Sequence, residues 1–133
     1  MKHILSDLNE SIGARGSLIL TTDGITVASV FEVSVNDDLI SALIDSLIRG
    51  ADRSLHGIGF APFATAVLSA DYGRIVFVAL HRAYLVVVLD SESPIDPVLL
   101  SIRSAAAEIE RRVRIAVQIH RRGRHWTSNT ATV

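Results

Sequence analysis

The residues that could do chemistry lie far apart in this 133-residue chain and form no recognisable catalytic group. Its five histidines are His3, His56, His81, His120 and His125. None of them has the short spacing from a second ligand that zinc sites use, and the chain has no cysteine to complete such a site. We therefore expect surface or loop roles for the histidines, with no metal ion and no cofactor.

The carboxylates show no catalytic pattern either. Asp37 and Asp38 are adjacent, but an apolar helical pattern begins immediately after them, so capping explains them better than acid–base chemistry. No nucleophile, base and orienting residue can be assembled from the sequence. We expect a protein that is not an enzyme and has no catalytic residue.

Nucleotide-binding signatures are missing as well. The sequence has no Gly-x4-Gly-Lys-Ser/Thr loop, so the chain is not itself a P-loop GTPase or ATPase. Gly57-Ile58-Gly59 follows a helical pattern and precedes a strand, which is the reverse of the dinucleotide-binding arrangement. The glycines therefore indicate turns.

Arginines give the chain its clearest electrostatic feature. Residues 111–133 carry six arginines and no acid, whereas residues 1–110 carry 14 acidic and 7 basic side chains. The six are Arg111, Arg112, Arg114, Arg121, Arg122 and Arg124. They fit a solvated helix end, favoured by the helix dipole, or a docking patch for an acidic protein or an anionic membrane surface. Nucleic acid is not expected, because Trp126 is the only aromatic residue nearby.

Length and composition indicate one globular domain. Hydrophobic residues make up 49% of the chain and aromatic residues 5%, so the core must be aliphatic. No signal peptide and no membrane-spanning stretch is recognisable, and we expect a cytoplasmic protein. We expect residues 3–120 to form the domain and residues 121–133 a basic, flexible tail.

Local patterns predict eight elements in the order α-β-β-α-β-β-β-α. Gly13 ends a first helix, and two β-prone runs flank Asp23-Gly24, a strong hairpin signal. Asn36, Asp37 or Asp38 can cap the second helix, and Asp96-Pro97 begins the last one, with the acid at the cap. The expected strands are Ser17–Thr22, Ile25–Phe31, Phe63–Leu68, Arg74–Leu80 and Tyr84–Leu89. The fold class is α+β, a five-stranded antiparallel sheet with helices on both faces.

Two apolar surfaces exceed what one copy can bury. On the Leu39–Leu55 helix the apolar residues cover half of the circumference, which suggests one contact with the sheet and one with something else. If Ser17–Thr22 pairs with the last strand, Phe63–Leu68 is left as an apolar sheet edge. A second copy would cover both surfaces across a two-fold axis; the alternative is a monomer whose tail covers the edge. The expected dimer interface comprises Leu43, Leu47, Ala51, Phe63, Ala64, Ala66 and Leu68.

The sequence resembles the Roadblock/dynein light chain family, particularly its bacterial MglB-like members. The likeness is carried by residues 13–20, residues 22–29, the helix from Ala42 to Leu55, the hairpin from Gly73 to Asp90 and an Ala- and Glu-rich last helix. The resemblance implies a Roadblock/longin-like fold and a homodimer joined through its third strands. It also implies a partner, a small Ras-like GTPase of the MglA type, to which the family contributes no catalytic residue.

Carried onto this chain, the resemblance places the partner contact on the polar edge of the second helix. The residues there are Asp45, Arg49, Asp52 and Arg53. The expected function is thus a homodimeric, non-catalytic module that binds and regulates a small GTPase. The alternatives are a small-molecule-sensing domain and a purely structural scaffold.

Overall fold

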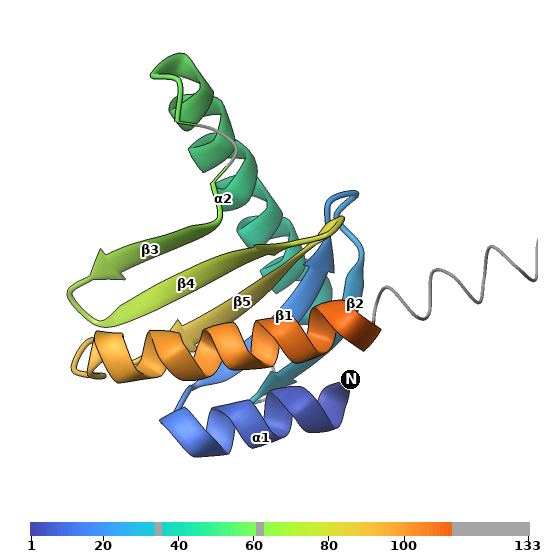
Figure 1. Cartoon of the computed structure of the whole chain (residues 1–133), viewed down its shortest axis with the longest axis vertical. Coiled ribbons are helices and arrows are strands. Elements are labelled where there is room, and N and C mark those ends of the chain that lie inside the picture. Colours follow the sequence, from blue (N-terminus) through green and yellow to red (C-terminus); the bar gives the residue numbers. More distant parts are fainter. Residues whose placement is uncertain (34–35, 61–62, 113–133) are drawn as a thin grey trace, which may run out of the picture.

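An antiparallel sheet with helices on both faces forms the protein (Figure 1), and the computed structural model describes residues 1–33, 36–60 and 63–112. The elements are α1 (Lys2–Ile12), β1 (Gly16–Thr21), β2 (Thr26–Phe31), α2 (Asp37–Gly57), β3 (Thr65–Ala70), β4 (Gly73–Leu80), β5 (Ala83–Leu89) and a final helix, of which residues 95–112 are described. The predicted order and fold class are confirmed. The predicted tail lies outside the described residues.

The sheet has the strand order β2-β1-β5-β4-β3. β1 pairs antiparallel with β5, placing Ser17 opposite Val87, so the predicted pairing of the first and last strands is confirmed. The Asp23-Gly24 hairpin also forms, with Gly24 at a φ of 88° and the Thr21 hydroxyl accepting a hydrogen bond from the Ile25 N–H at 3.0 Å. β3 is left at one edge of the sheet, as the sequence predicted.

Two apolar cores lie on the two faces of the sheet. The larger joins α1 and the final helix, which lie side by side in Figure 1, to the sheet; Leu5, Ile102 and Ile109 are completely buried there. The smaller joins α2 to the opposite face through Ile44 and Ile48. α2 lies behind the sheet in this view, and its C-terminal half extends past β3.

The ends of the helices follow local chemistry. Gly13 ends α1 in the left-handed conformation, at φ 66° and ψ 35°, and its N–H bonds to the Asn9 carbonyl. The Asn36 side chain caps α2 by accepting a hydrogen bond from the Leu39 N–H at 3.2 Å. The final helix begins at residue 95, two residues before the predicted first helical residue, Pro97. Asp96 therefore lies in its first turn and is not its cap.

The Asn9 amide ties α1 to two strands. Its nitrogen donates to the Val30 carbonyl at 3.1 Å, and its oxygen accepts from the Ser17 hydroxyl at 2.8 Å. Ser17 is completely buried, so this bond supplies a partner for a hydroxyl that water cannot reach. No pattern in the sequence indicated this bridge.

β3 occupies a different span from the one predicted. It runs from Thr65 to Ala70, two residues later than the expected Phe63–Leu68. The cause is its register with β4, which pairs Ala70 with Gly73 and leaves only Asp71 and Tyr72 for the turn. The strand therefore continues to the turn and does not end at its last large apolar residue.

Candidate interaction surfaces

The wide apolar stripe of α2 divides into a buried part and an exposed part. Ile44 and Ile48 each retain 5% exposure, because they pack on the sheet. Leu39, Leu43 and Leu47 follow one another at intervals of one turn and remain 58%, 54% and 42% exposed. We call these three leucines the α2 ridge. The stripe thus makes one contact within the chain and leaves a second one open.

Small residues flank the α2 ridge. Ser46 and Ser54 are exposed beside it, and Gly50 lies between them on the same helix face. A Cβ built on Gly50 would meet no atom within 4 Å. Packing within the chain therefore does not require glycine at this position, although glycine costs helix stability there. Such a position suits close approach by a second helix.

The β3 edge lies open beside this surface. β3 pairs with β4 on one side only, and Val67 and Leu68 are 42% and 47% exposed. Leu68 is opposite Ile75 in the register, and Ile75 belongs to the core that α2 covers. Leu68 and the α2 ridge therefore lie on the same side of the sheet. No charged residue occurs in β3, so nothing in the strand protects its unpaired backbone groups.

The seven residues expected at a dimer interface fall into two groups. Leu43, Leu47, Ala64 and Leu68 are exposed, whereas Ala51, Phe63 and Ala66 are half-buried. Phe63 stacks on Tyr84, with ring centroids 5.9 Å apart, and so belongs partly to the chain's own core. Burial raises the pKa of Tyr84, and the charges of Asp52 and Asp45 add to that increase. Sequence reasoning missed this pair, because the two residues are joined only through the fold.

The polar edge of α2 carries an ion pair and a histidine–carboxylate contact. The Arg49 guanidinium bonds to the Asp45 carboxylate at 2.8 Å, and the ring of His56 lies 3.5 Å from the Asp52 carboxylate. The hydrogen bond to Asp45 and the charge of that carboxylate raise the pKa of Arg49. Arg53 is exposed one turn beyond Arg49. All four predicted partner-binding residues thus belong to one helix: Asp45, Arg49 and Arg53 follow one another at one-turn intervals, and Asp52 directly precedes Arg53.

Further apolar exposure, which the sequence interpretation did not single out, continues beyond α2. Ile58 and Phe60 are 64% and 70% exposed directly after the helix ends. An apolar residue on each side of Gly59, in a predicted turn, was the available signal. These residues extend the apolar surface of the projecting end of α2.

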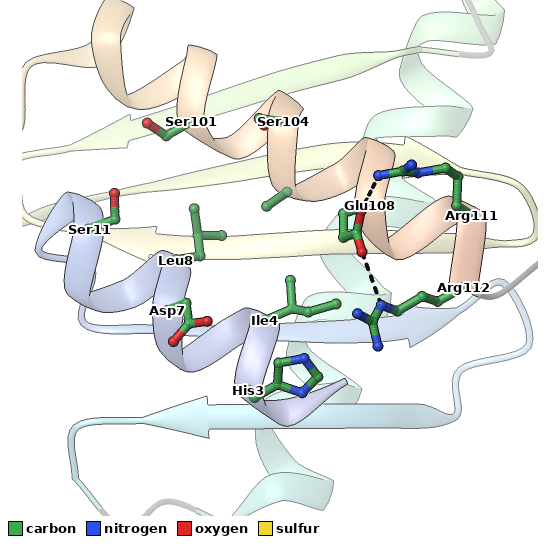
Figure 2. A pocket seen from close by; sticks show the side chains of 11 residues that line it. His3, Ile4, Asp7, Leu8, Ser11, Ser101, Ser104, Glu108, Arg111 and Arg112 are labelled. Carbon is green, nitrogen blue, oxygen red and sulfur yellow. Dashed lines mark hydrogen bonds and ion pairs between the residues drawn. The ribbon is translucent and has the colours of Figure 1, made fainter.

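A groove on the opposite face separates α1 from the final helix (Figure 2) and has a volume of about 570 Å³. Its base includes Ile4 and Leu8, and at one end Glu108 pairs with both Arg111 and Arg112. A hydrogen bond from Arg112 and the charge of Arg111 lower the pKa of Glu108. Two of the six clustered arginines are thus engaged at the helix end. The others, Arg114, Arg121, Arg122 and Arg124, lie outside the described residues.

The described residues contain no cluster of three or more potential metal ligands. None of the helices in the described ranges combines the length and apolar character needed to span a bilayer.

Comparisons with known proteins connect this geometry to a fold. No family model matches the sequence. Two uncharacterized proteins of Methanocaldococcus jannaschii are each 25% identical over 107 residues, covering 80% of this chain and 94% of each relative. They extend the similarity without supplying a function.

Solved structures are more informative about the architecture. MglB from Myxococcus xanthus aligns with a TM-score of 0.77 at 16% identity, covering 85% of this chain and 94% of that one. The gliding protein MglB from Thermus thermophilus gives 0.70 at 21% identity, over 82% and 84% of the two chains. The Roadblock/LC7 domain from Streptomyces avermitilis gives 0.70 at 16% identity, over 89% and 98%. The resemblance found in the sequence is thereby confirmed at the level of architecture: the chain has the fold of MglB and the Roadblock/LC7 domain proteins.

Proposed function

We propose that the protein is a homodimeric, non-catalytic interaction module that binds and regulates a small Ras-like GTPase of the MglA type. The observation that carries this proposal is the α2 ridge, three leucines about half exposed, beside the uncovered apolar edge β3. The similarity of the fold to MglB supports the choice of partner.

The first step is dimer formation. Pairing of β3 with β3 of a second copy would continue the sheet and supply partners for the unpaired backbone groups of both edges. The α2 ridge of each copy lies on the same side of the sheet as Leu68, so the two ridges would meet over the joined strands. Gly50 and the flanking serines would let the helices approach closely. One two-fold axis would cover both apolar surfaces.

The second step is recognition of the partner. The polar edge formed by Asp45, Arg49, Asp52 and Arg53 runs along the side of α2 away from its ridge. In a dimer two such edges would flank the joined helices and present a mixed-charge rim around an apolar centre, as protein interfaces commonly do. Regulation would then come from holding or reshaping the GTPase, because no catalytic group is contributed.

Light scattering after size-exclusion chromatography tests the first step. The full chain is expected at twice its monomer mass of 14.4 kDa over a range of concentrations. A variant ending at residue 120 should behave in the same way. A monomer across the range contradicts the dimer, and a dimer only after truncation indicates that residues 121–133 cover the edge in the full chain.

A pulldown with a small GTPase from the same genome tests the second step. Binding should differ between the GTP- and GDP-loaded forms, and the double variant Arg49→Glu/Arg53→Glu should lose it while remaining a dimer. Arg103, exposed on the final helix, supplies the control Arg103→Glu, which should bind normally. Equal binding of both nucleotide forms would remove the regulatory proposal.

Small-molecule sensing is the alternative function. The groove between α1 and the final helix, about 570 Å³, is a candidate site for it. Its charged end is already engaged in the pairs between Glu108 and the two arginines, which leaves few free polar groups to orient a ligand. A metabolite retained in native mass spectrometry would favour this alternative.

A further inference from the structure

β2 forms the second open edge of the sheet, at the opposite end from β3 (Figure 1). It pairs with β1 on one side only, and it carries no charged residue between Thr26 and Phe31. Charged side chains on an edge strand ordinarily keep other strands from pairing with it. β2 has no such protection of its own, and a dimer joined through β3 would leave it uncovered.

The register of β2 shows which of its backbone groups face outward. The Glu32 N–H donates to the Arg15 carbonyl at 2.9 Å, so the backbone of Glu32 faces β1. Successive residues of an antiparallel strand alternate between facing the neighbouring strand and facing away from it, which turns the backbone of Ser29 and Phe31 outward. Among the described residues none forms a hydrogen bond with these outward groups. The register shift lies near the start of β2, so this part of the edge is regular.

A hollow of about 410 Å³ lies beside this edge, between β2 and α1. Its charged lining residues are Glu10 and Glu32, both exposed, and no basic residue of the described ranges lines it. Neither carboxylate forms a hydrogen bond or ion pair with a described residue. Arg15, opposite Glu32, is paired with Asp90, and Lys2 lies roughly two turns of α1 away from Glu10. The hollow therefore keeps a negative charge that its described neighbours do not cancel.

The two sides of the β2 edge offer different surfaces to an added strand. Val30 packs against the core under α1, whereas the half-buried Phe31 packs against the core under α2. The alternation of side chains along a strand places Glu32 on the same side as Val30, beside the hollow. Val33, 68% exposed, follows directly and adds apolar surface. A strand laid along this edge would meet carboxylates on its α1 side and an aromatic ring on its α2 side.

We propose that the β2 edge binds an extended segment of a partner protein as an added antiparallel strand, in which basic and apolar residues alternate. The backbone of the segment would pair with the outward groups of Ser29 and Phe31. Its basic side chains would lie along the hollow and reach Glu10 and Glu32, while its apolar side chains would contact the ring of Phe31. A second copy of this chain fits less well, because its own β2 edge would bring the same two acids to the contact.

Fluorescence anisotropy of the full chain with short labelled peptides tests the proposal. The first peptide alternates lysine and valine, and the second has glutamine in place of lysine. Residues that pair directly across an antiparallel ladder share a face, so the valines would pair with Ser29 and Phe31. A third peptide therefore carries N-methyl groups on its valine amides, and a fourth, its control, carries them on its lysine amides. We expect the first and fourth to bind, with an affinity that falls as salt is added, and the others to bind at least about tenfold more weakly.

Two variants of the protein separate backbone pairing from charge. Ser29→Pro removes one outward N–H and should keep the fold, checked by circular dichroism, because an edge strand tolerates proline where the N–H faces solvent. It should weaken binding of the lysine peptide about tenfold. Glu10→Gln/Glu32→Gln leaves the backbone unchanged and should weaken the same peptide by a similar factor without affecting the glutamine peptide. Glu92→Gln/Asp96→Asn removes two exposed acids outside this surface and is the matched control, which should bind normally.

Several outcomes would overturn the proposal. Equal binding of the peptide methylated at valine, or normal binding by folded Ser29→Pro, excludes strand addition at β2. Equal binding of the glutamine peptide, or unchanged affinity in the Glu10→Gln/Glu32→Gln variant, excludes recognition of a basic segment. A variant ending at residue 120 that binds the lysine peptide at least tenfold more tightly than the full chain would assign the edge to residues 121–133 of the chain itself. The assay reads the edge opposite β3, so a monomer in light scattering leaves its result unaffected.

Discussion

The two faces of the sheet are covered by helices to different degrees. We call the face under α1 and the final helix the finished face, and the face under α2 the unfinished face. On one face α1 and the final helix share the covering, and Leu5, Ile102 and Ile109 have no exposed surface. On the other face a single longer helix, α2, buries Ile44 and Ile48 and leaves the α2 ridge about half exposed. A helix needs an apolar stripe only a little over 100° wide to cover one face of a sheet. The wider stripe of α2 therefore leaves apolar surface for the second contact that we propose.

The largest effect is expected from a substitution in the core of the finished face. Ile102→Ala removes a fully buried side chain and should lower the free energy of unfolding by about 2–5 kcal/mol, measured by urea denaturation. Leu100→Ala, on the same helix but 72% exposed, should change it by less than about 0.5 kcal/mol. Equal losses would show that the assignment of buried and exposed sides on this helix is wrong.

A charge on the unfinished face should act on association instead. Leu43→Glu puts a carboxylate on the α2 ridge, where it is solvated in a monomer but would be buried in the proposed dimer. We expect at least a tenfold rise in the dimer dissociation constant, about 1.4 kcal/mol, measured by analytical ultracentrifugation. Leu100→Glu gives the same charge outside the interface and should leave the dimer intact. If both variants dimerise normally, the α2 ridge is not the contact.

Gly50 allows a sharper test, because its two expected effects have opposite signs. Gly50→Leu replaces a poor helix former in open space, so the monomer should gain up to about 1 kcal/mol of unfolding free energy. The same side chain would obstruct close approach of two α2 helices and should weaken the dimer. Denaturation at low concentration and sedimentation at high concentration separate the two effects. If the variant is more stable and its dimer dissociation constant is unchanged, the two α2 helices do not approach each other closely at Gly50.

The sequence predicted those parts of the fold that local chemistry decides. Asp23-Gly24 specified the hairpin, Gly13 the end of α1, and the half-circle stripe indicated that α2 carries more apolar surface than the sheet covers. It placed Leu43 and Leu47 on the outward side but did not single out Leu39, since the outward side depends on how the helix crosses the sheet. The predicted span of β3 was wrong by two residues, because the limits of this strand are set by its register with β4.

The candidate site shows the same division between features that local sequence decides and features that depend on tertiary packing. The four polar residues of α2 were identifiable from helical spacing alone, and the contacts of Asp45 with Arg49 and of Asp52 with His56 follow from it. The Phe63–Tyr84 stack and the Asn9 bridge were not identifiable. Each depends on segments that meet only after the sheet has formed.

The smallest expected effect concerns the charged border of the finished face. Arg112 and Arg111 lower the pKa of Glu108, so the charged form stabilises the fold above the ordinary glutamate pKa of about 4.3. That contribution is lost as the pH falls through the lower value of the folded state. Glu108→Gln should therefore reduce the melting temperature slightly at neutral pH, and the difference from the unmodified protein should vanish in acid.

The double variant Glu108→Gln/Arg112→Gln completes a thermodynamic cycle for this pair. Both side chains are substantially exposed, so the coupling should be small and should weaken with added salt. A large, salt-independent coupling would mean that the finished face depends on its ionic border as well as on Ile102 and the other buried residues. A small coupling, beside the large loss expected for Ile102→Ala, would locate its stability in apolar packing, which the exposed α2 ridge lacks among the described residues.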